Sequence, residues 1–208
     1  MAINKNTTSY TVSFAVVLVC ICGALLAFLA TQLKEPQQAN VANEKRQFIL
    51  SAAGFASIDS LKSLKKSEIE KIFEKSVTSV VYNFNGEPID GENAFSIDIV
   101  KEFKATKNEP KIRRYPVFTC VNGNDTSYVI SMAGNGLWGP VWGFAALGAD
   151  QNTISGIVFD HKSETPGLGA KITESSFQNM FTDTPKMVMK KDKYMGIKVV
   201  KGGLKEPD

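Results

Sequence analysis

Hydrophobic and polar positions divide the chain into an uncharged N-terminal run and a longer, mixed remainder. Residues 11–33 form a run of 23 residues without a charged side chain. As an α-helix this run is roughly 34 Å long, and the hydrocarbon core of a bilayer is about 30 Å thick. A cleaved signal peptide has an apolar region of only about 7–15 residues before a small-residue cleavage site. No Ala-x-Ala follows the run, so we expect a retained transmembrane helix at 11–33.

Helical spacing of apolar residues recurs beyond this run. It predicts a helix at 37–53 that Gly54 ends. Ser67 and Glu70 fit a capping box, which predicts that a second, shorter helix begins there. Thr173 is placed to cap a third helix near the C-terminus.

Strand-like patterns fill most of the second half of the chain. Segments rich in β-branched and aromatic residues predict strands at 76–84, 115–121, 127–132, 139–148, 153–160 and 198–200. Turn residues at 122–126 and 149–152 join two pairs of these strands as hairpins. Helices early and near the end, with hairpins between them, indicate an α+β fold: one transmembrane helix followed by a single domain of antiparallel strands and helices. The basic tract 104–114 fits either a solvated loop or a docking patch.

Composition excludes several classes of function. The net charge of +3 is small, and no basic stripe with interleaved aromatic residues predicts a nucleic-acid partner. His161 is the single histidine, so we expect no histidine-rich metal site. Gly-x-Gly-x-x-Gly at 134–139 leads into a strand pattern and not into a helix, and no P-loop occurs, so nucleotide binding by either route is not supported. Cys120 lies within a strand pattern, which is typical of a buried and inert thiol.

Two glycine-containing stretches carry the candidate chemistry. The first, at 134–144, places two tryptophans and a phenylalanine among four glycines and suits an aromatic cofactor. Trp142 and Phe144 lie inside the strand pattern and are expected in the core, whereas Trp138 lies nearer the bend and is the better ligand candidate. The second stretch is Ser-Glu-Thr-Pro-Gly-Leu-Gly-Ala at 163–170.

The second stretch has two interpretations when taken alone. Gly167 and Gly169 lack a Cβ and can adopt positive φ, so a flat ligand or another strand can approach their backbone closely. The same residues also fit an ordinary strand-to-helix turn. His161 nearby fits either a hydrogen-bond donor to a cofactor edge or a surface residue at a strand end.

The two stretches together resemble one known family. A single N-terminal span followed by Gly-Asn-Gly-Leu-Trp at 134–138, Ile-x-Gly-Ile at 154–157 and Glu-Thr-Pro-Gly-Leu-Gly at 164–169 is similar to the C subunit of the bacterial Na+-translocating NADH:quinone oxidoreductase. The likeness extends from the anchor to about residue 203. The last motif also resembles the G subunit of the related Rnf electron-transport complex, whereas Asn-Gly-Leu-Trp favours the quinone reductase.

The resemblance implies an electron-carrying subunit with an FMN-binding type of domain. Such a subunit passes electrons from NADH toward ubiquinone or menaquinone within a translocase that exports Na+, and complete catalysis is not expected from this chain alone. The implied partners are the other membrane subunits of the complex and a flavin transferase that matures the subunit.

The resemblance also implies a single-pass location in the bacterial inner membrane. The expected organisation is a cytoplasmic arm at 1–10, a transmembrane helix at 11–33, a helical connector at 34–54 and a periplasmic FMN-binding domain at 55–208. The basic residues around the span do not by themselves decide its orientation.

The residues expected to bind FMN come from both glycine-containing stretches. Leu137 and Trp138 are expected to wall the isoalloxazine from one side, and backbone N–H groups near its carbonyl edge are expected to favour the reduced anion. Glu164 fits an orienting residue or a structural carboxylate. The full expected set is Leu137, Trp138, Glu164, Thr165, Gly167, Leu168 and Gly169.

The chain departs from the family pattern at its C-terminus. In this family FMN is joined through its phosphate to a threonine of a Ser-Gly-Ala-Thr motif C-terminal to the Glu-Thr-Pro-Gly-Leu-Gly run. These 208 residues contain no Ser-Gly-Ala-Thr. We therefore expect a truncated form that lacks covalent FMN, and the attachment residue stays unknown.

Two alternatives stand beside this interpretation. The chain fits a G-type subunit of an Rnf complex or an FMN-binding membrane regulator. It also fits a membrane-anchored interaction module without a cofactor, in which the tryptophan-containing turn binds protein or glycan.

Overall fold

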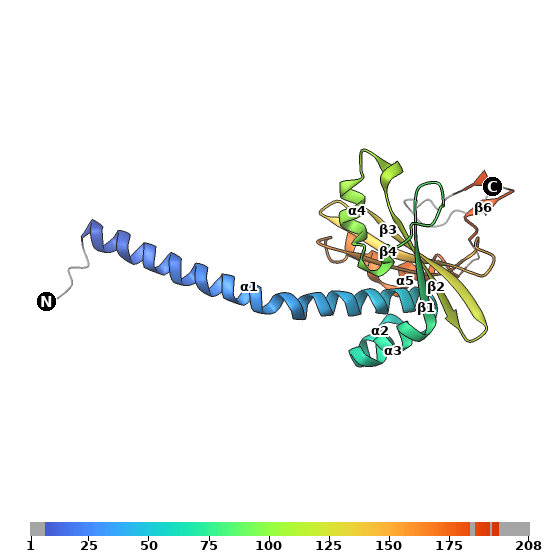
Figure 1. The fold of residues 1–208 in the computed structure, drawn as a ribbon, viewed down its shortest axis with the longest axis horizontal. Coiled ribbons are helices and arrows are strands. Elements are labelled where there is room, and N and C mark those ends of the chain that lie inside the picture. The colour runs from blue at the N-terminus through green and yellow to red at the C-terminus, as the bar shows by residue number, and fades with distance from the viewer. Residues whose placement is uncertain (1–6, 184–185, 192, 196–208) are drawn as a thin grey trace. The chain divides into compact units, whose positions relative to one another are not determined.

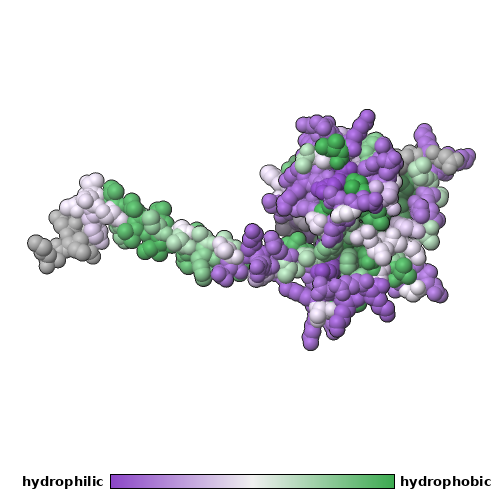
Figure 2. All heavy atoms as spheres, viewed as in Figure 1, coloured by the Kyte–Doolittle hydropathy of each residue, from purple (hydrophilic) through white to green (hydrophobic). Residues whose placement is uncertain are grey.

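The computed structural model describes residues 7–183, 186–191 and 193–195. The chain forms two compact units, Met1–Glu44 and Lys45–Asp208. Helix α1 (Thr8–Ala52) contains the expected span and is long and apolar enough to cross a membrane. Figure 2 shows hydrophobic side chains along its first part. The helix expected at 37–53 is the last part of this same helix, which continues through Pro36.

The end of α1 belongs to the second unit and is closed by a Schellman motif. Gly54 has φ +80°, and its N–H donates to the carbonyl of Ser51 at 3.0 Å. The N–H of Phe55 donates to the carbonyl of Leu50, also at 3.0 Å. These two bonds satisfy carbonyls that the helix leaves unpaired, so Gly54 ends the helix as predicted.

Two short helices follow, and the predicted capping box is wrong. Helix α2 (Ile58–Ser63) precedes α3 (Lys66–Ser76). The carboxylate of Glu68 accepts a hydrogen bond from the N–H of Lys65 at 2.9 Å, so the chain enters α3 before Ser67. Glu70 instead pairs with Arg46 of α1 at 2.8 Å. Ser67 therefore lies inside the helix, and the carboxylate expected to cap it takes part in a tertiary ion pair.

A five-stranded antiparallel sheet forms the centre of the second unit (Figure 1). Each strand pairs with the next one along the chain, in the order β1-β2-β3-β4-β5. The strands are β1 (Val77–Tyr82), β2 (Tyr115–Asn122), β3 (Asp125–Asn135), β4 (Pro140–Leu147) and β5 (Ile154–His161). The two predicted hairpins are therefore confirmed, and the first has longer strands and a tighter turn than the pattern indicated.

Alternating side chains bury both faces of this sheet. Phe144 and Val158 pack in a cluster with Phe48 from the end of α1. Their strand neighbours Ala145 and Ile157 pack on the opposite face, in a cluster that includes Phe181. This change of face between successive residues is the period-two geometry of a strand. Phe144 is a core residue, as expected, and Trp142 is half-buried.

The remaining elements are short. They are η1 (Ala94–Ser96), α4 (Ile99–Ala105), η2 (Pro110–Ile112), η3 (Gly169–Thr173), α5 (Ser175–Asn179), β6 (Met189–Lys190) and β7 (Lys193–Tyr194). The predicted cap at Thr173 is wrong: its hydroxyl donates back to the carbonyl of Ala170 at 3.0 Å, and α5 begins two residues later. The strand expected at 198–200 lies outside the described residues.

The basic tract 104–114 is partly used within the fold. The Arg113 guanidinium lies 5.0 Å from the centre of the Phe103 ring. Arg114 pairs with Glu102 at 2.7 Å and with Glu92 at 3.1 Å. The hydrogen bond from Arg114 is the main cause that lowers the pKa of the Glu102 carboxyl below its usual range. These arginines fasten α4 to the start of β2, so the end of the tract is part of the fold, whereas Lys104, Lys107 and Lys111 are exposed.

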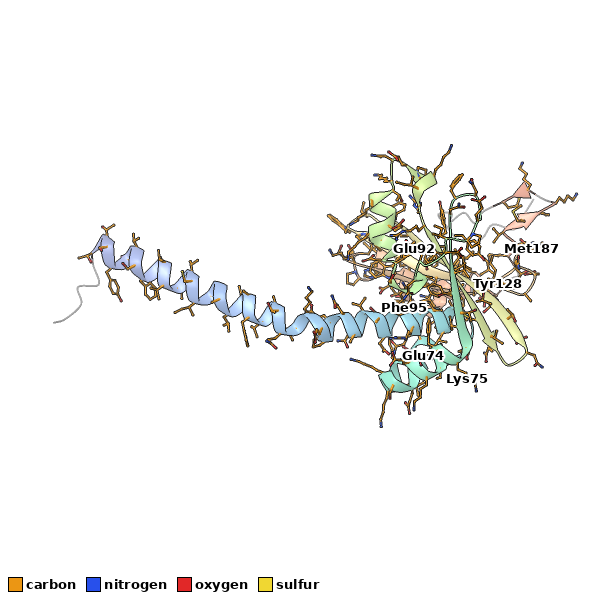
Figure 3. All side chains as sticks on the ribbon, in the orientation of Figure 1. Glu74, Lys75, Glu92, Phe95, Tyr128 and Met187 are labelled. Carbon is orange, nitrogen blue, oxygen red and sulfur yellow. The ribbon has the colours of Figure 1, made fainter. Side chains whose placement is uncertain are left out.

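Two cations of α1 hold η1 against the domain. The Lys45 ammonium donates to the carbonyls of Phe95 and Ile97 at 2.7 and 2.8 Å. It lies 5.1 Å from the centre of the Phe95 ring, and the Arg46 guanidinium lies 4.9 Å from the same centre. Figure 3 shows Phe95 beside the end of α1. Burial lowers the pKa of Lys45 from 10.5 to about 8, with Asp98 acting in the opposite direction.

The lowered pKa of Lys45 makes the free energy of unfolding depend on pH in the alkaline range. Between about pH 8 and 10.5 the unfolded chain keeps a proton on Lys45 that the folded chain loses, so the free energy of unfolding contributed by this residue rises with pH. In urea unfolding of the detergent-solubilised chain, Lys45→Met should remove a rise of up to about 3 kcal/mol across this window. Identical pH profiles for the two proteins would contradict the assignment.

Candidate functional site

The two glycine-containing stretches form adjacent turns at one end of the sheet. Residues 136–139 connect β3 to β4, and residues 162–168 follow β5. Because β4 pairs with β5, with Val141 opposite His161, both turns lie at the same end of these two strands. The N–H of Lys162 donates to the carbonyl of Pro140 at 3.0 Å, which carries the pairing up to the turns. The first is called the Trp138 turn below, and the second the Glu164 turn.

The buried carboxylate of Glu164 joins the two turns. Its Oε1 atom accepts hydrogen bonds from the backbone N–H groups of Trp138 at 2.8 Å and Gly139 at 3.3 Å. The hydroxyl of Ser163 donates to the carbonyl of Trp138 at 3.0 Å. Only 8% of Glu164 is exposed, so these hydrogen bonds are shielded from water. A hydrogen bond is stronger in the protein interior than in water. Glu164 thus acts on the shape of the neighbouring turn.

His161 supports the same turn through its ring. Its Nδ1 atom accepts a hydrogen bond from the N–H of Glu164 at 3.2 Å, so a neutral ring carries its proton on Nε2. This contact makes His161 part of the Glu164 turn, and the residue is half-buried at the end of β5. The set of residues predicted to bind FMN left out Ser163 and His161, although His161 was considered as a donor to a cofactor edge and both lie within three residues of Glu164.

Three glycines make room for this junction. A Cβ on Gly136 would collide with Oε1 of Glu164, and a Cβ on Gly169 would lie 2.5 Å from its Oε2. A Cβ on Gly139 would lie 2.5 Å from Oγ of Ser163. Real Cβ atoms essentially never come this close to other atoms. The missing Cβ of Gly169 therefore accommodates the side chain of Glu164.

Gly167 has a different role. Its φ of +75° is in the left-handed region, which side chains other than glycine rarely adopt. Around it the carbonyl of Thr165 accepts hydrogen bonds from the N–H groups of Leu168 at 3.1 Å and Ala170 at 3.2 Å. Gly167 thus allows the chain to turn back and close this compact loop, and the prediction that it can adopt positive φ is confirmed. Gly169, for which positive φ was also predicted to be accessible, does not adopt it.

The tips of both turns expose large apolar side chains. The exposed fractions are 83% for Leu137, 68% for Trp138 and 73% for Leu168. Thr165 is exposed as well. Large apolar side chains that are exposed on two hydrogen-bonded turns are typical of a binding surface. The structure therefore places six of the seven predicted site residues on the two joined turns and Gly169 directly after them, at the start of η3. The carboxylate of Glu164, the backbone N–H of Trp138 and Gly169 meet in the junction.

Cys120 plays no part in this site. It lies in the core on β2, and burial raises its thiol pKa to about 12. A thiol with such a pKa stays protonated at neutral pH and does not act as a nucleophile. The prediction of a buried and inert cysteine is confirmed.

Comparisons with known proteins agree on one family. Residues 136–204 match the FMN-binding domain family. The C subunit of the Na(+)-translocating NADH-quinone reductase of Vibrio parahaemolyticus is 30% identical over 98% of this chain and 82% of its own length. The corresponding protein of Vibrio vulnificus is 31% identical over 96% of this chain and 80% of its own length. The chain belongs to the family of C subunits of Na(+)-translocating NADH-quinone reductases. The resemblance predicted from the two motifs is confirmed.

A solved structure from this C subunit family confirms the fold. The crystal structure of the protein from Parabacteroides distasonis matches with a TM-score of 0.69 and 34% sequence identity, over 83% of this chain and 79% of that chain. The predicted α+β class, with one apolar helix before a domain of antiparallel strands and helices, is likewise confirmed. The FMN-binding match begins at Gly136, the first residue of the Trp138 turn, and includes the whole Glu164 turn.

The collision between Gly169 and Glu164 gives a test by double-mutant cycle. Gly169→Ala should lower the free energy of unfolding by about 1–3 kcal/mol, because the added methyl group overpacks the junction. In a Glu164→Ala background the same change should cost much less, since the carboxylate it meets is gone. Urea unfolding of the four proteins measures the coupling.

The matched control is Gly123→Ala, in the turn between β2 and β3. Nothing lies within 4 Å of a Cβ built there, although its φ of +63° strains a substitution. Its cost should be the same with and without the Glu164→Ala change. Equal costs of Gly169→Ala in both backgrounds would refute the steric role of the glycine.

Proposed function

We propose that this chain is the FMN-carrying C subunit of a sodium-pumping NADH:quinone reductase. It passes electrons within the complex from NADH toward ubiquinone or menaquinone, and the complex exports Na+. The observation that carries the proposal is the junction of the Trp138 and Glu164 turns, because it holds exposed apolar side chains rigidly at the start of the FMN-binding match. Membership of the C subunit family supports the same role.

The residues of the two turns fit a flat aromatic cofactor. Leu137, Trp138 and Leu168 offer apolar surface against which an isoalloxazine ring packs. Thr165 adds an exposed hydroxyl. Bound FMN supplies the electron-transfer chemistry, and the protein supplies placement and the local electrostatic environment. Gly167 shapes the loop that carries Leu168, and Gly169 leaves space for Glu164.

Glu164 is best described as a positioning residue. Its carboxylate occupies the N–H groups of Trp138 and Gly139. These two donors are therefore already engaged, and the expectation that turn amides favour the reduced anion does not apply to them. The buried carboxylate fixes the backbone of Trp138 and thereby the position of its ring.

The organisation of the chain in the membrane follows the same proposal. Residues 11–33 anchor the protein in the bacterial inner membrane, with the arm 1–10 in the cytoplasm. Residues 34–54 connect the anchor to the FMN-binding domain at 55–208 on the periplasmic side. The exposed apolar surface of α1 supports the anchor. The partners are the other membrane subunits of the complex, in which this chain acts as a redox subunit of the translocase.

Binding of FMN tests the proposed site directly. Free FMN added to the purified full chain should quench tryptophan fluorescence, and Trp138→Ala should weaken binding about tenfold, because one aromatic contact contributes about 0.5–1.5 kcal/mol beyond its buried area. Trp142→Phe, a change in the half-buried tryptophan of β4, is the matched control and should leave the affinity unchanged. Absence of binding to the unaltered chain, or equal losses in both variants, would overturn the site.

Covalent attachment gives a separate test. We propose that the family's flavin transferase joins FMN to a threonine of a Ser-Gly-Ala-Thr motif, which these 208 residues lack. Intact-mass measurement after coproduction with the transferase should show no FMN adduct on the 208-residue chain. A version with the motif appended should acquire one. A phosphoester-linked flavin on the unaltered chain would contradict the proposed attachment.

A further inference from the structure

His161 lies at the point where β5 ends and the Glu164 turn begins. In the pairing of β4 with β5 it stands opposite Val141, and one residue later the N–H of Lys162 donates to the carbonyl of Pro140 at 3.0 Å. The backbone N–H of His161 donates to Oδ1 of Asp160 at 2.7 Å. The half-buried ring of His161 is therefore carried by backbone that the sheet and Asp160 hold in place.

The ring of His161 closes the first half of the turn. Its Nδ1 atom accepts the hydrogen bond from the N–H of Glu164 at 3.2 Å, three residues further along the chain. Side chains that bind nearby backbone N–H groups in this way are a common means of closing a turn. The carboxylate of the same Glu164 accepts the hydrogen bonds from Trp138 and Gly139. Glu164 is thus held at its main chain by the end of β5 and at its side chain by the Trp138 turn.

The bond between His161 and Glu164 requires a neutral ring. A neutral imidazole has one nitrogen that accepts a hydrogen bond, whereas a protonated imidazole carries N–H groups on both nitrogens and accepts none. With a protonated ring, the Nδ1–H of His161 and the N–H of Glu164 are two donors that face each other, so the bond is lost. Histidine is the side chain that ordinarily changes its charge between about pH 5 and pH 8. Acid therefore breaks this connection between β5 and Glu164.

The charged residues near this ring come from β5, the Glu164 turn and the segment around η3. Asp160 precedes the ring on β5, and the turn adds Lys162 and Glu164. Of the described elements that pack against β5, β4 and α5 contain no ionisable side chain, whereas η3 contains Lys171 and is followed by Glu174. The Trp138 turn contains no ionisable side chain either. Carboxylates also gain protons as the pH falls, so a test by pH has to separate them from the ring.

We propose that His161 is a positioning residue for the cofactor site, because its neutral ring holds Glu164 where the carboxylate binds the Trp138 turn. The inference rests on the proposed function for its link to FMN, whereas the contact between the ring and Glu164 does not. Trp138 is exposed, and the hydrogen bond from its N–H to Glu164 fixes the backbone that carries its indole. Protonation of His161 frees the main chain of Glu164, so Trp138 is held less firmly and the site binds FMN less tightly in acid than at pH 8.

Hydrogen exchange followed by NMR on the detergent-solubilised full chain tests the contact without a flavin. Protection of the Glu164 amide, measured against its intrinsic exchange rate at each pH, should fall about tenfold from pH 8 to pH 5, because its N–H loses an acceptor. The amide of Trp138 should lose protection in parallel. In His161→Asn, Oδ1 takes the place of Nδ1 and does not titrate, so protection should stay close to its pH 8 value. In His161→Ala it should be low at both pH values.

FMN titration of the same three proteins tests the link to the cofactor. The phosphate of FMN also gains a proton in this pH range, so each affinity is compared with that of His161→Asn at the same pH. The unaltered chain should match His161→Asn at pH 8 and bind FMN severalfold more weakly than His161→Asn at pH 5. The variant His161→Ala should bind severalfold more weakly than His161→Asn at both pH values.

Each part of the proposal can fail separately. A pH profile of Glu164 protection that is flat, or that the unaltered chain shares with His161→Asn, would overturn the role of ring protonation. Full protection in His161→Ala would show that the ring does not hold the turn. Loss of protection in acid without a change in relative FMN affinity would overturn the positioning role. If the unaltered chain binds no FMN at either pH, the proposed function and the link to FMN fail together, while the exchange result still decides the contact.

Discussion

The carboxylate of Glu164 is the contact on which the candidate site depends. It connects the Trp138 turn and the Glu164 turn, which lie at the same end of the sheet. A buried carboxyl group is costly unless it is hydrogen-bonded, and the backbone N–H groups of Trp138 and Gly139 both donate to its Oε1 atom. The glycines at 136 and 169 follow from the same contact, since their side-chain positions are occupied by the carboxylate. Residues that look like separate features of two motifs therefore form one steric and electrostatic unit.

The main elements of the fold could be predicted because their signals are local. The alternation along β2 and the turn residues between paired strands predicted the hairpins, and Gly54 predicted the end of α1. The predicted caps at Ser67 and Thr173 failed because capping depends on which acceptor reaches the helix entrance, and at α3 Glu68 took that role. For Glu70 the competing partner was Arg46, which lies 24 positions away. The partner of such a side chain is decided by tertiary contacts that the local sequence does not contain.

The candidate site was predicted in its membership but not in its internal arrangement. The motifs named Trp138 and Glu164 together, yet no pattern indicated that one bonds to the backbone of the other across 26 residues. The glycines were expected to admit a ligand, whereas Gly169 accommodates Glu164.

The exposed tips of the two turns affect the solubility of the protein before it assembles with its partners. The side chains of Leu137, Trp138 and Leu168 are exposed to water on turns that hydrogen bonds join to each other. A surface of this kind lowers colloidal stability and favours self-association at high concentration. A cofactor or subunit that covers these side chains soon after synthesis therefore also prevents self-association of the protein.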